Sequence, residues 1–153
     1  WKEFTMKVKD CMCGEVWCAK PDTKINEVAK LMEKNHIGCV PICDPNNCLV
    51  GMITDRDIAL RTVACGKDAK NTTASEIMSC NVCCCNENDE VCDVEKKMST
   101  NQVRRIPVVD DNKVIGILTL GDLANYNEEI GSEQICDTLE NICECGGQAK
   151  NNY

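Results

Sequence analysis

The sequence is poor in aromatic residues and has a single histidine. Phe, Trp and Tyr together make up 3% of the 153 residues, so the core must be built from aliphatic and small side chains. The one histidine, His36, has no serine or cysteine partner placed beside it by any motif. No catalytic triad, acid/base pair or phosphate-cleaving motif is recognisable. We therefore expect no catalytic residues and a protein that is not an enzyme.

Positive charge is also in short supply. The chain has 17 Lys and Arg against 25 Asp and Glu, a net charge of −8, which argues against nucleic-acid binding and against docking on an anionic membrane. No apolar run approaches the roughly 18 residues of a membrane span, and the first residues, W-K-E-F-T-M-K-V-K-D, lack the apolar region of a signal peptide. We expect a cytoplasmic protein without a nucleic-acid or membrane partner.

Cysteine, by contrast, is abundant, with 15 in the chain. An odd count without an export signal favours reduced thiols over a disulfide scaffold. Cys80 and Cys83 form a C-x-x-C pair, but tetrahedral zinc usually takes its ligands from two such pairs, and a second is missing. We expect thiols that fill small buried spaces and no metal ligands. Metal or redox sensing by the cysteines stays open as an alternative.

The chain contains two copies of one pattern. A shift of 66 residues superposes Pro41 on Pro107, and after one extra turn residue a shift of 65 superposes Gly51 on Gly116. Each copy predicts an extended segment, an amphipathic helix, two short apolar strands and a second helix. The strands are expected at Val40–Cys43 and Leu49–Thr54 in the first copy and at Ile106–Val109 and Val114–Thr119 in the second. Suitable N-caps for the amphipathic helix are Asp22 or Thr23 in the first copy and Asn88 or Asp89 in the second. We expect copies at 6–66 and 74–127, a linker at 67–73, a C-terminal helix within 128–145 and a flexible tail at 146–153. Apolar residues at helical spacing, Ile135, Leu139 and Ile142, place that helix at Ser132–Cys143.

The junction between the last strand and the second helix is the strongest local signal. It reads G-M-I-T-D-R-D-I in the first copy and G-I-L-T-L-G-D-L in the second. A Thr followed three residues later by Asp is a helix-capping pattern. A carboxylate at such a place can also accept hydrogen bonds from the hydroxyls of a ribose, so both interpretations stay open on the residues alone.

The tandem β-α-β-β-α units, the strands V-P-I and I-P-V and the two G-h-h-T-x-x-D-h junctions (h, hydrophobic) resemble a cystathionine-β-synthase (CBS) domain pair, or Bateman module, of the small stand-alone type. The resemblance runs from about Met6 to Asn125. It implies a mixed α/β fold in which two repeats pack as a pseudo-two-fold pair. It also implies a regulatory role, in which an adenosine-type ligand (AMP, ADP, ATP or S-adenosylmethionine) controls an unidentified partner protein.

The resemblance also assigns ligand-binding residues. Asp57 and Asp122 would hold ribose hydroxyls, with Thr54 and Thr119 near the ribose or phosphate. The backbone of Val16–Cys18 and of Val82–Cys84 would face the adenine. The remaining expected contacts are the walls Val40, Pro41, Ile106 and Pro107 and the phosphate-binding candidates Arg56, Arg104 and Arg105.

The basic residues are not repeated between the copies. Arg104 and Arg105 align with Gly38 and Cys39, and Arg56 aligns with Gly121, so we expect two unequal ligand sites. The apolar helix faces exceed what one small pair can cover, which predicts a homodimer. A dimeric interaction scaffold that has lost ligand binding is a further alternative. The Thr and Asp present at both junctions argue against it.

Overall fold

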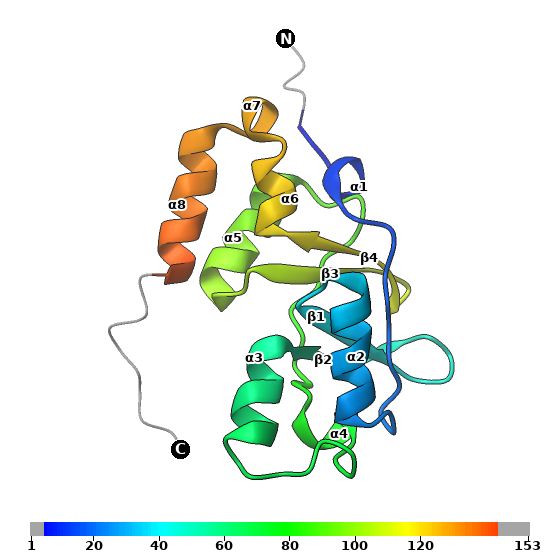
Figure 1. Ribbon diagram of the computed structural model, residues 1–153. Coiled ribbons are helices and arrows are strands. Elements are labelled where there is room, and N and C mark those ends of the chain that lie inside the picture. Colours follow the sequence, from blue (N-terminus) through cyan, green and yellow to red (C-terminus); the bar gives the residue numbers. More distant parts are fainter. Residues whose placement is uncertain (1–4, 144–153) are drawn as a thin grey trace. The chain divides into compact units, whose positions relative to one another are not determined.

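The computed structural model describes residues 5–143, and the predicted tail at 146–153 lies outside the described residues. The described chain divides into two compact units (Figure 1). Unit 2 contains residues 15–82 and 109–115, and unit 1 contains residues 5–14, 83–108 and 116–143. The units do not coincide with the repeats, because the first residues of the chain belong with most of the second repeat.

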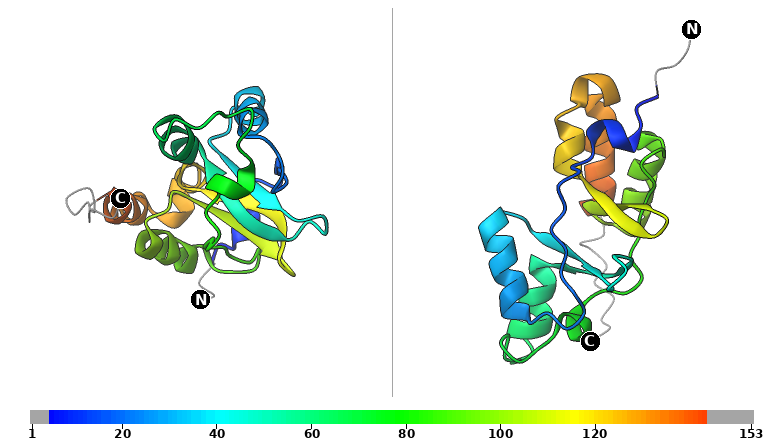
Figure 2. Two further views of the ribbon diagram at one scale, coloured as in Figure 1. Left: turned by 90° about the horizontal axis from the view of Figure 1, so that it is seen from below. Right: turned by 90° about the vertical axis from the view of Figure 1, so that its right-hand side faces the viewer.

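Unit 2 is built on an antiparallel hairpin. Its strands are β1 (Cys39–Cys43) and β2 (Leu49–Thr54), with Cys39 paired to Thr54 and Pro41 to Met52. The hairpin packs with α2 (Ile25–Asn35) and α3 (Asp55–Ile58), which the π-helical turn η1 (Ala59–Val63) extends (Figure 2). The short helix α4 (Ala74–Ile77) contacts β2. The core of this unit contains Ala19, Ile25, Val28, Met32, Val40, Ile42, Ile53, Ala74 and Ile77.

Unit 1 contains the equivalent elements of the second repeat. The helix α5 (Val91–Asn101) precedes the paired strands β3 (Arg105–Asp110) and β4 (Lys113–Thr119), whose turn is grouped with unit 2. The chain then forms α6 (Leu120–Ala124), α7 (Asn127–Ile130) and α8 (Ser132–Cys143), and α1 (Val8–Cys11) joins from the first repeat. In Figure 1, α8 lies beside α5, with which it packs.

These elements confirm the predicted mixed α/β class, and the two apolar strands of each repeat and α8 lie where the sequence indicated. On α8, Ile135 and Ile142 are buried as expected, but Leu139 is 42% exposed and Thr138 is buried in its place. None of the described helices is long and apolar enough to cross a bilayer.

The first predicted strand of each repeat is reduced to a single bridge. Val16–Cys18 and Val82–Cys84 are extended segments outside any strand. The residue after each makes one parallel bridge, Ala19 to Ile42 in unit 2 and Cys85 to Val108 in unit 1. The β-α-β-β-α pattern is therefore present in order, but its first strand is too short to form a ladder.

Two strand glycines allow the residues that follow the short helices α4 and α1 to approach a strand closely. A Cβ at Gly51 on β2 would lie 2.5 Å from Sδ of Met78, and one at Gly116 on β4 would lie 2.7 Å from Sδ of Met12. In each case the methionine belongs to the other repeat, so the glycine of one repeat leaves room for a methionine side chain of the other. This close approach explains why both copies have Gly at this position.

Candidate functional site

The first junction forms a complete capping box at the start of α3. The Asp57 amide donates to Oγ1 of Thr54 at 3.1 Å, and the Thr54 amide donates to Oδ2 of Asp57 at 2.9 Å. The Thr54 hydroxyl also donates to Oδ2 of Asp57 at 3.0 Å. The cap therefore uses one carboxylate oxygen and leaves Oδ1 outside the box.

The second junction repeats this geometry at the start of α6. The Asp122 amide donates to Oγ1 of Thr119 at 3.1 Å, and the Thr119 amide donates to Oδ2 of Asp122 at 2.8 Å. Both aspartates are half-buried in the first turn of the helix that follows the strand. The capping interpretation of the two junctions is thus confirmed, and a sugar contact would have to use the second carboxylate oxygen.

An ion pair that sequence reasoning missed distinguishes the two junctions. Nη2 of Arg61 lies 3.6 Å from Oδ1 of Asp57. Arg61 also donates through Nη1 to the Ile77 carbonyl at 2.7 Å. The i, i+4 spacing of Asp57 and Arg61 was the available signal. The second repeat has Tyr126 at the matching position, so Asp122 has no counterpart to this ion pair.

The other expected residues of the first repeat gather around β1 in unit 2. The Ala19 amide donates to the Pro41 carbonyl at 3.0 Å, which brings the segment Val16–Cys18 to the edge of β1. Thr54 pairs with Cys39 on the opposite edge of that strand. Val40 and Pro41 are buried, and Arg56 is exposed on α3.

Unit 1 gathers the corresponding residues around β3. The Cys85 amide donates to the Pro107 carbonyl at 3.0 Å, which brings Cys84 to the edge of this strand. Ile106 and Pro107 are buried, whereas Arg105 is half-buried. Val82, at the start of the same extended segment, is grouped with unit 2.

Arg104 lies beside the capping box of its own repeat through its backbone. Its carbonyl accepts from the Leu120 amide, the first residue of α6, at 3.0 Å. In the first repeat the Gly38 carbonyl accepts from Asp55 in the same way. The Arg104 side chain is exposed and reaches α8, where Nη2 lies 3.6 Å from Sγ of Cys143.

The cysteines that the structure describes are thiols without disulfides. Burial raises the pKa of Cys43 and of Cys85 to about 12, because the thiolate is disfavoured away from water. Among the described residues, three possible metal ligands meet at Glu90, Cys92 and Asp93, whose ligand atoms lie within 4.8 Å of one another. No motif in the sequence pointed to this group.

Comparisons with known proteins agree with the duplicated fold. The family model of the CBS domain matches residues 8–62 and 74–129. The CBS domain-containing protein YhcV of Bacillus subtilis is 43% identical over 138 residues, which cover 88% of this chain and 97% of YhcV.

The solved structures that are similar to this one include two with bound ligands. The CBS domain pair of protein MJ0100, in complex with 5′-methylthioadenosine and S-adenosyl-L-methionine, has a TM-score of 0.74 and 36% identity, covering 81% of this chain and 97% of that one. Hypoxic Response Protein I with two coordinated zinc ions has a TM-score of 0.74 and 31% identity, covering 79% and 98%. Hypoxic response protein 1 of Mycobacterium tuberculosis is 32% identical over 121 residues, which cover 79% of this chain and 85% of that protein.

Proposed function

The chain belongs to the CBS-domain family, and on that premise we propose that it is a regulatory protein that binds an adenosine-type ligand and is not an enzyme. The observation that carries the proposal is the duplicated Thr–Asp box, with matching hydrogen bonds at 54–57 and 119–122. The MJ0100 pair, at 36% identity, binds two molecules that share an adenosine.

In the proposed site the ribose hydroxyls donate to Asp57 in one repeat and to Asp122 in the other. Oδ2 of each aspartate already accepts from the cap, so Oδ1 is the atom proposed for the sugar. Charge-assisted hydrogen bonds of this kind are stronger than neutral ones. The extended segments and β1 and β3 supply the proposed adenine contacts, and Arg56, Arg104 and Arg105 the proposed phosphate contacts.

Titration calorimetry with S-adenosylmethionine, AMP, ADP and ATP tests the proposal. Asp57→Asn and Asp122→Asn keep an oxygen that can accept from the cap but remove the charge. Each should weaken one site by about tenfold to a hundredfold, the effect of losing a charged acceptor. Asp110→Asn, an exposed aspartate at the end of β3, is the matched control. A double variant that binds every ligand as tightly as the parent would refute the assignment.

Zinc binding is a second candidate function. Hypoxic Response Protein I coordinates two zinc ions, and in this chain the Glu90, Cys92 and Asp93 ligand atoms lie within 4.8 Å of one another. Thiolate and carboxylate are both zinc ligands. Metal analysis of protein purified without oxygen, compared with a Cys92→Ser variant, tests this function. A parent without zinc, or an equal zinc content in both proteins, contradicts it.

We also propose that the protein is a homodimer that acts on a partner protein. Exposed apolar side chains on η1 support this, since Leu60 is 48% exposed and Val63 is 72% exposed. Neighbouring exposed hydrophobic residues are typical of interfaces. Light scattering should give twice the 16.9 kDa of one chain, and Leu60→Glu/Val63→Glu should reduce it to one chain. A monomeric parent would contradict the dimer.

A further inference from the structure

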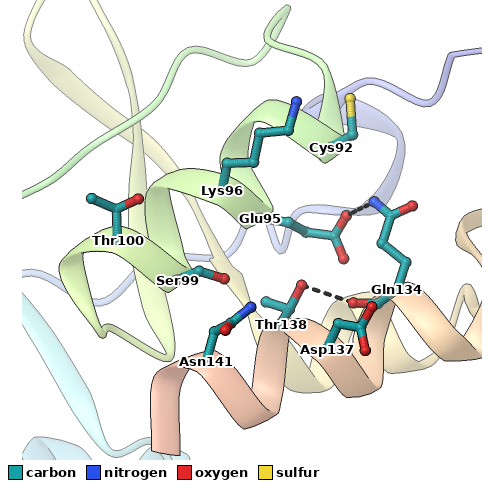
Figure 3. A pocket seen from close by; sticks show the side chains of 9 residues that line it. All are labelled: Cys92, Glu95, Lys96, Ser99, Thr100, Gln134, Asp137, Thr138 and Asn141. Atoms are coloured by element: carbon teal, nitrogen blue, oxygen red, sulfur yellow. Dashed lines mark hydrogen bonds between the residues drawn. The ribbon is translucent and has the colours of Figure 1, made fainter. Parts of the chain in front are cut away.

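A polar pocket lies between α5 and α8 in unit 1, lined by none of the residues assigned to the nucleotide. Its volume is about 460 Å³, within the range of pockets that hold small molecules. Figure 3 shows side chains of both helices around it. Unlike a typical ligand pocket, it is lined by carboxylates, hydroxyls and amides.

Glu95 is the buried group of this pocket. It is 2% exposed, and its Oε2 accepts a hydrogen bond from Nε2 of Gln134 (Figure 3). Oε1 is buried without a hydrogen-bond partner among the described residues. The Thr138 hydroxyl donates to the Gln134 carbonyl at 2.9 Å. A buried carboxylate oxygen without a donor is costly, so a donor carried by a bound molecule would stabilise this group.

The charges around the pocket indicate which kind of ligand could donate a hydrogen bond to Glu95. Asp137 on α8 is a second carboxylate of the lining. The one basic residue of the lining, Lys96, lies with Nζ 3.5 Å from Asp93, and Figure 3 shows its ammonium directed away from Glu95. Ser99 and Asn141 add neutral polar groups. The pocket therefore presents net negative charge and favours a cation that carries N–H donors.

We propose that this pocket binds a small organic amine as its primary ammonium ion, with an ammonium N–H donating to the buried Glu95 carboxylate, which a small movement of the exposed Gln134 side chain would uncover. Asp137 adds a second anionic contact, and the hydroxyl and amide groups accept or donate at the rest of the ligand. The site would give the protein a second ligand in addition to the proposed nucleotide, and it stands whether or not the nucleotide binds.

Titration calorimetry on the full chain, in phosphate buffer, tests the site with 1,4-diaminobutane as the probe. Saturable binding at one site is expected. 1,4-Bis(trimethylammonio)butane has the same two charges and spacer but no N–H, and it should bind at least about tenfold more weakly because it cannot donate to Glu95. Equal binding of the two cations, or no binding of the diamine at millimolar concentration, would overturn the proposal.

Glu95→Gln removes the charge at nearly constant volume and should weaken diamine binding by about tenfold to a hundredfold. Glu140→Gln makes the same charge change on α8 at an exposed residue outside the pocket lining and should leave the affinity unchanged. Asp137→Asn supplies a second pocket variant, and circular dichroism verifies that each variant is folded. If both glutamate variants bind alike, or if Mg²⁺ displaces the diamine and binds more tightly, the site is not an amine site.

Discussion

The carboxylates of this acidic chain differ in what surrounds them. Asp57 and Asp122 accept hydrogen bonds from backbone amides at half-buried positions. Glu95 is buried on α5 and has a side-chain partner for only one of its oxygens. Burial raises the pKa of Glu95, while the neighbouring side chains of Gln134 and Thr138 oppose this effect.

The raised pKa of Glu95 predicts a pH-dependent cost to stability. Below the ordinary pKa the carboxyl is protonated in both the folded and the unfolded chain. As the pH rises above 4.5, the unfolded chain loses this proton first, so the contribution of Glu95 to stability falls until the folded group also ionises. Glu95→Gln should therefore melt near the parent's temperature at pH 4 and a few degrees above it at pH 7.

Melting curves of the parent and of Glu95→Gln from pH 4 to pH 7.5, in buffers without amines, test this prediction. Other titrating groups cancel in the difference between the two proteins. Glu140→Gln should show no such pH-dependent difference, because Glu140 is exposed. A stabilising effect of Glu95→Gln that is largest at low pH would contradict a raised pKa for this carboxyl.

Burial divides the cysteines into two reactivity classes. The pKa of Cys43 and of Cys85 is raised to about 12 and that of Cys11 to about 11, in each case chiefly by burial. The thiolate is the reactive form, so iodoacetamide at pH 7.5 should leave these three unlabelled while exposed Cys65 reacts.

Peptide mass spectrometry of briefly labelled native protein checks this order of reactivity, and labelling in urea is the control in which all cysteines should react. Equal labelling of Cys43 and Cys65 in the native protein would show that the described packing is wrong around β1. The same measurement bears on the sensing alternative, since a redox sensor needs an accessible thiol with a lowered pKa.

The elements of each repeat were predictable to different degrees. The strands β1 to β4 follow short apolar runs bounded by Asp and Asn turns, and their expected bounds differ from the structure by at most one residue at either end. The starts of α2 and α5 were harder. Thr23 and Asp89 are suitable N-caps by residue type, yet the helices begin after Lys24 and Glu90 without a side-chain cap.

Tertiary backbone contacts explain this difference. Thr23 and Asp89 instead accept from the amides of Lys20 and Asn86, at 3.0 and 3.1 Å, in the turn before each helix. The first amides of α2 and α5 donate to carbonyls distant in sequence, such as Ile25 to Thr72 at 3.0 Å. Local capping rules cannot identify such partners, because they lie far away along the chain.

The strand glycines give a prediction at the scale of the hairpins. Gly116→Ala and Gly51→Ala each place a methyl group against a methionine side chain and a backbone carbonyl, with Cys13 O at 3.0 Å and Ser79 O at 3.1 Å from the new Cβ. Such overpacking should lower the free energy of unfolding by about 1–3 kcal/mol. Gly14→Ala, with nothing within 4 Å, is the matched control and should change it little. Urea denaturation measures all three, and equal midpoints would contradict the close approach.

At the scale of the whole chain, the repeat was readable from sequence but its division into units was not. Matching residues such as Pro41 and Pro107 reveal the duplication. The grouping of residues 5–14 with the second repeat depends on backbone hydrogen bonds, including the Val8 amide to the Asp89 carbonyl at 3.0 Å. The pocket between α5 and α8 likewise arises where two helices distant in sequence pack together.

The duplication also predicts that the two proposed ligand sites are unequal. In the second repeat Arg104 lies by its backbone at the start of α6, where the first repeat has Gly38. In the first repeat Arg61 already pairs with Asp57 at 3.6 Å. The second repeat therefore offers more unpaired positive charge to a polyphosphate and should bind ATP more tightly. Adenosine is neutral, so its affinities for the two sites should differ less.

Calorimetry with ATP and then adenosine tests this asymmetry. One arginine contact is worth about 1.5–3 kcal/mol, so Arg104→Ala/Arg105→Ala should lower the affinity of the tighter ATP site about tenfold to a hundredfold. Adenosine binding should stay the same, because it has no phosphate. Lys30→Ala/Lys34→Ala removes the same charge from exposed positions on α2 and controls for the loss of net charge. Two equal ATP sites in the parent, or equal ATP losses in both double variants, would mean that Arg104 and Arg105 act only as surface charge.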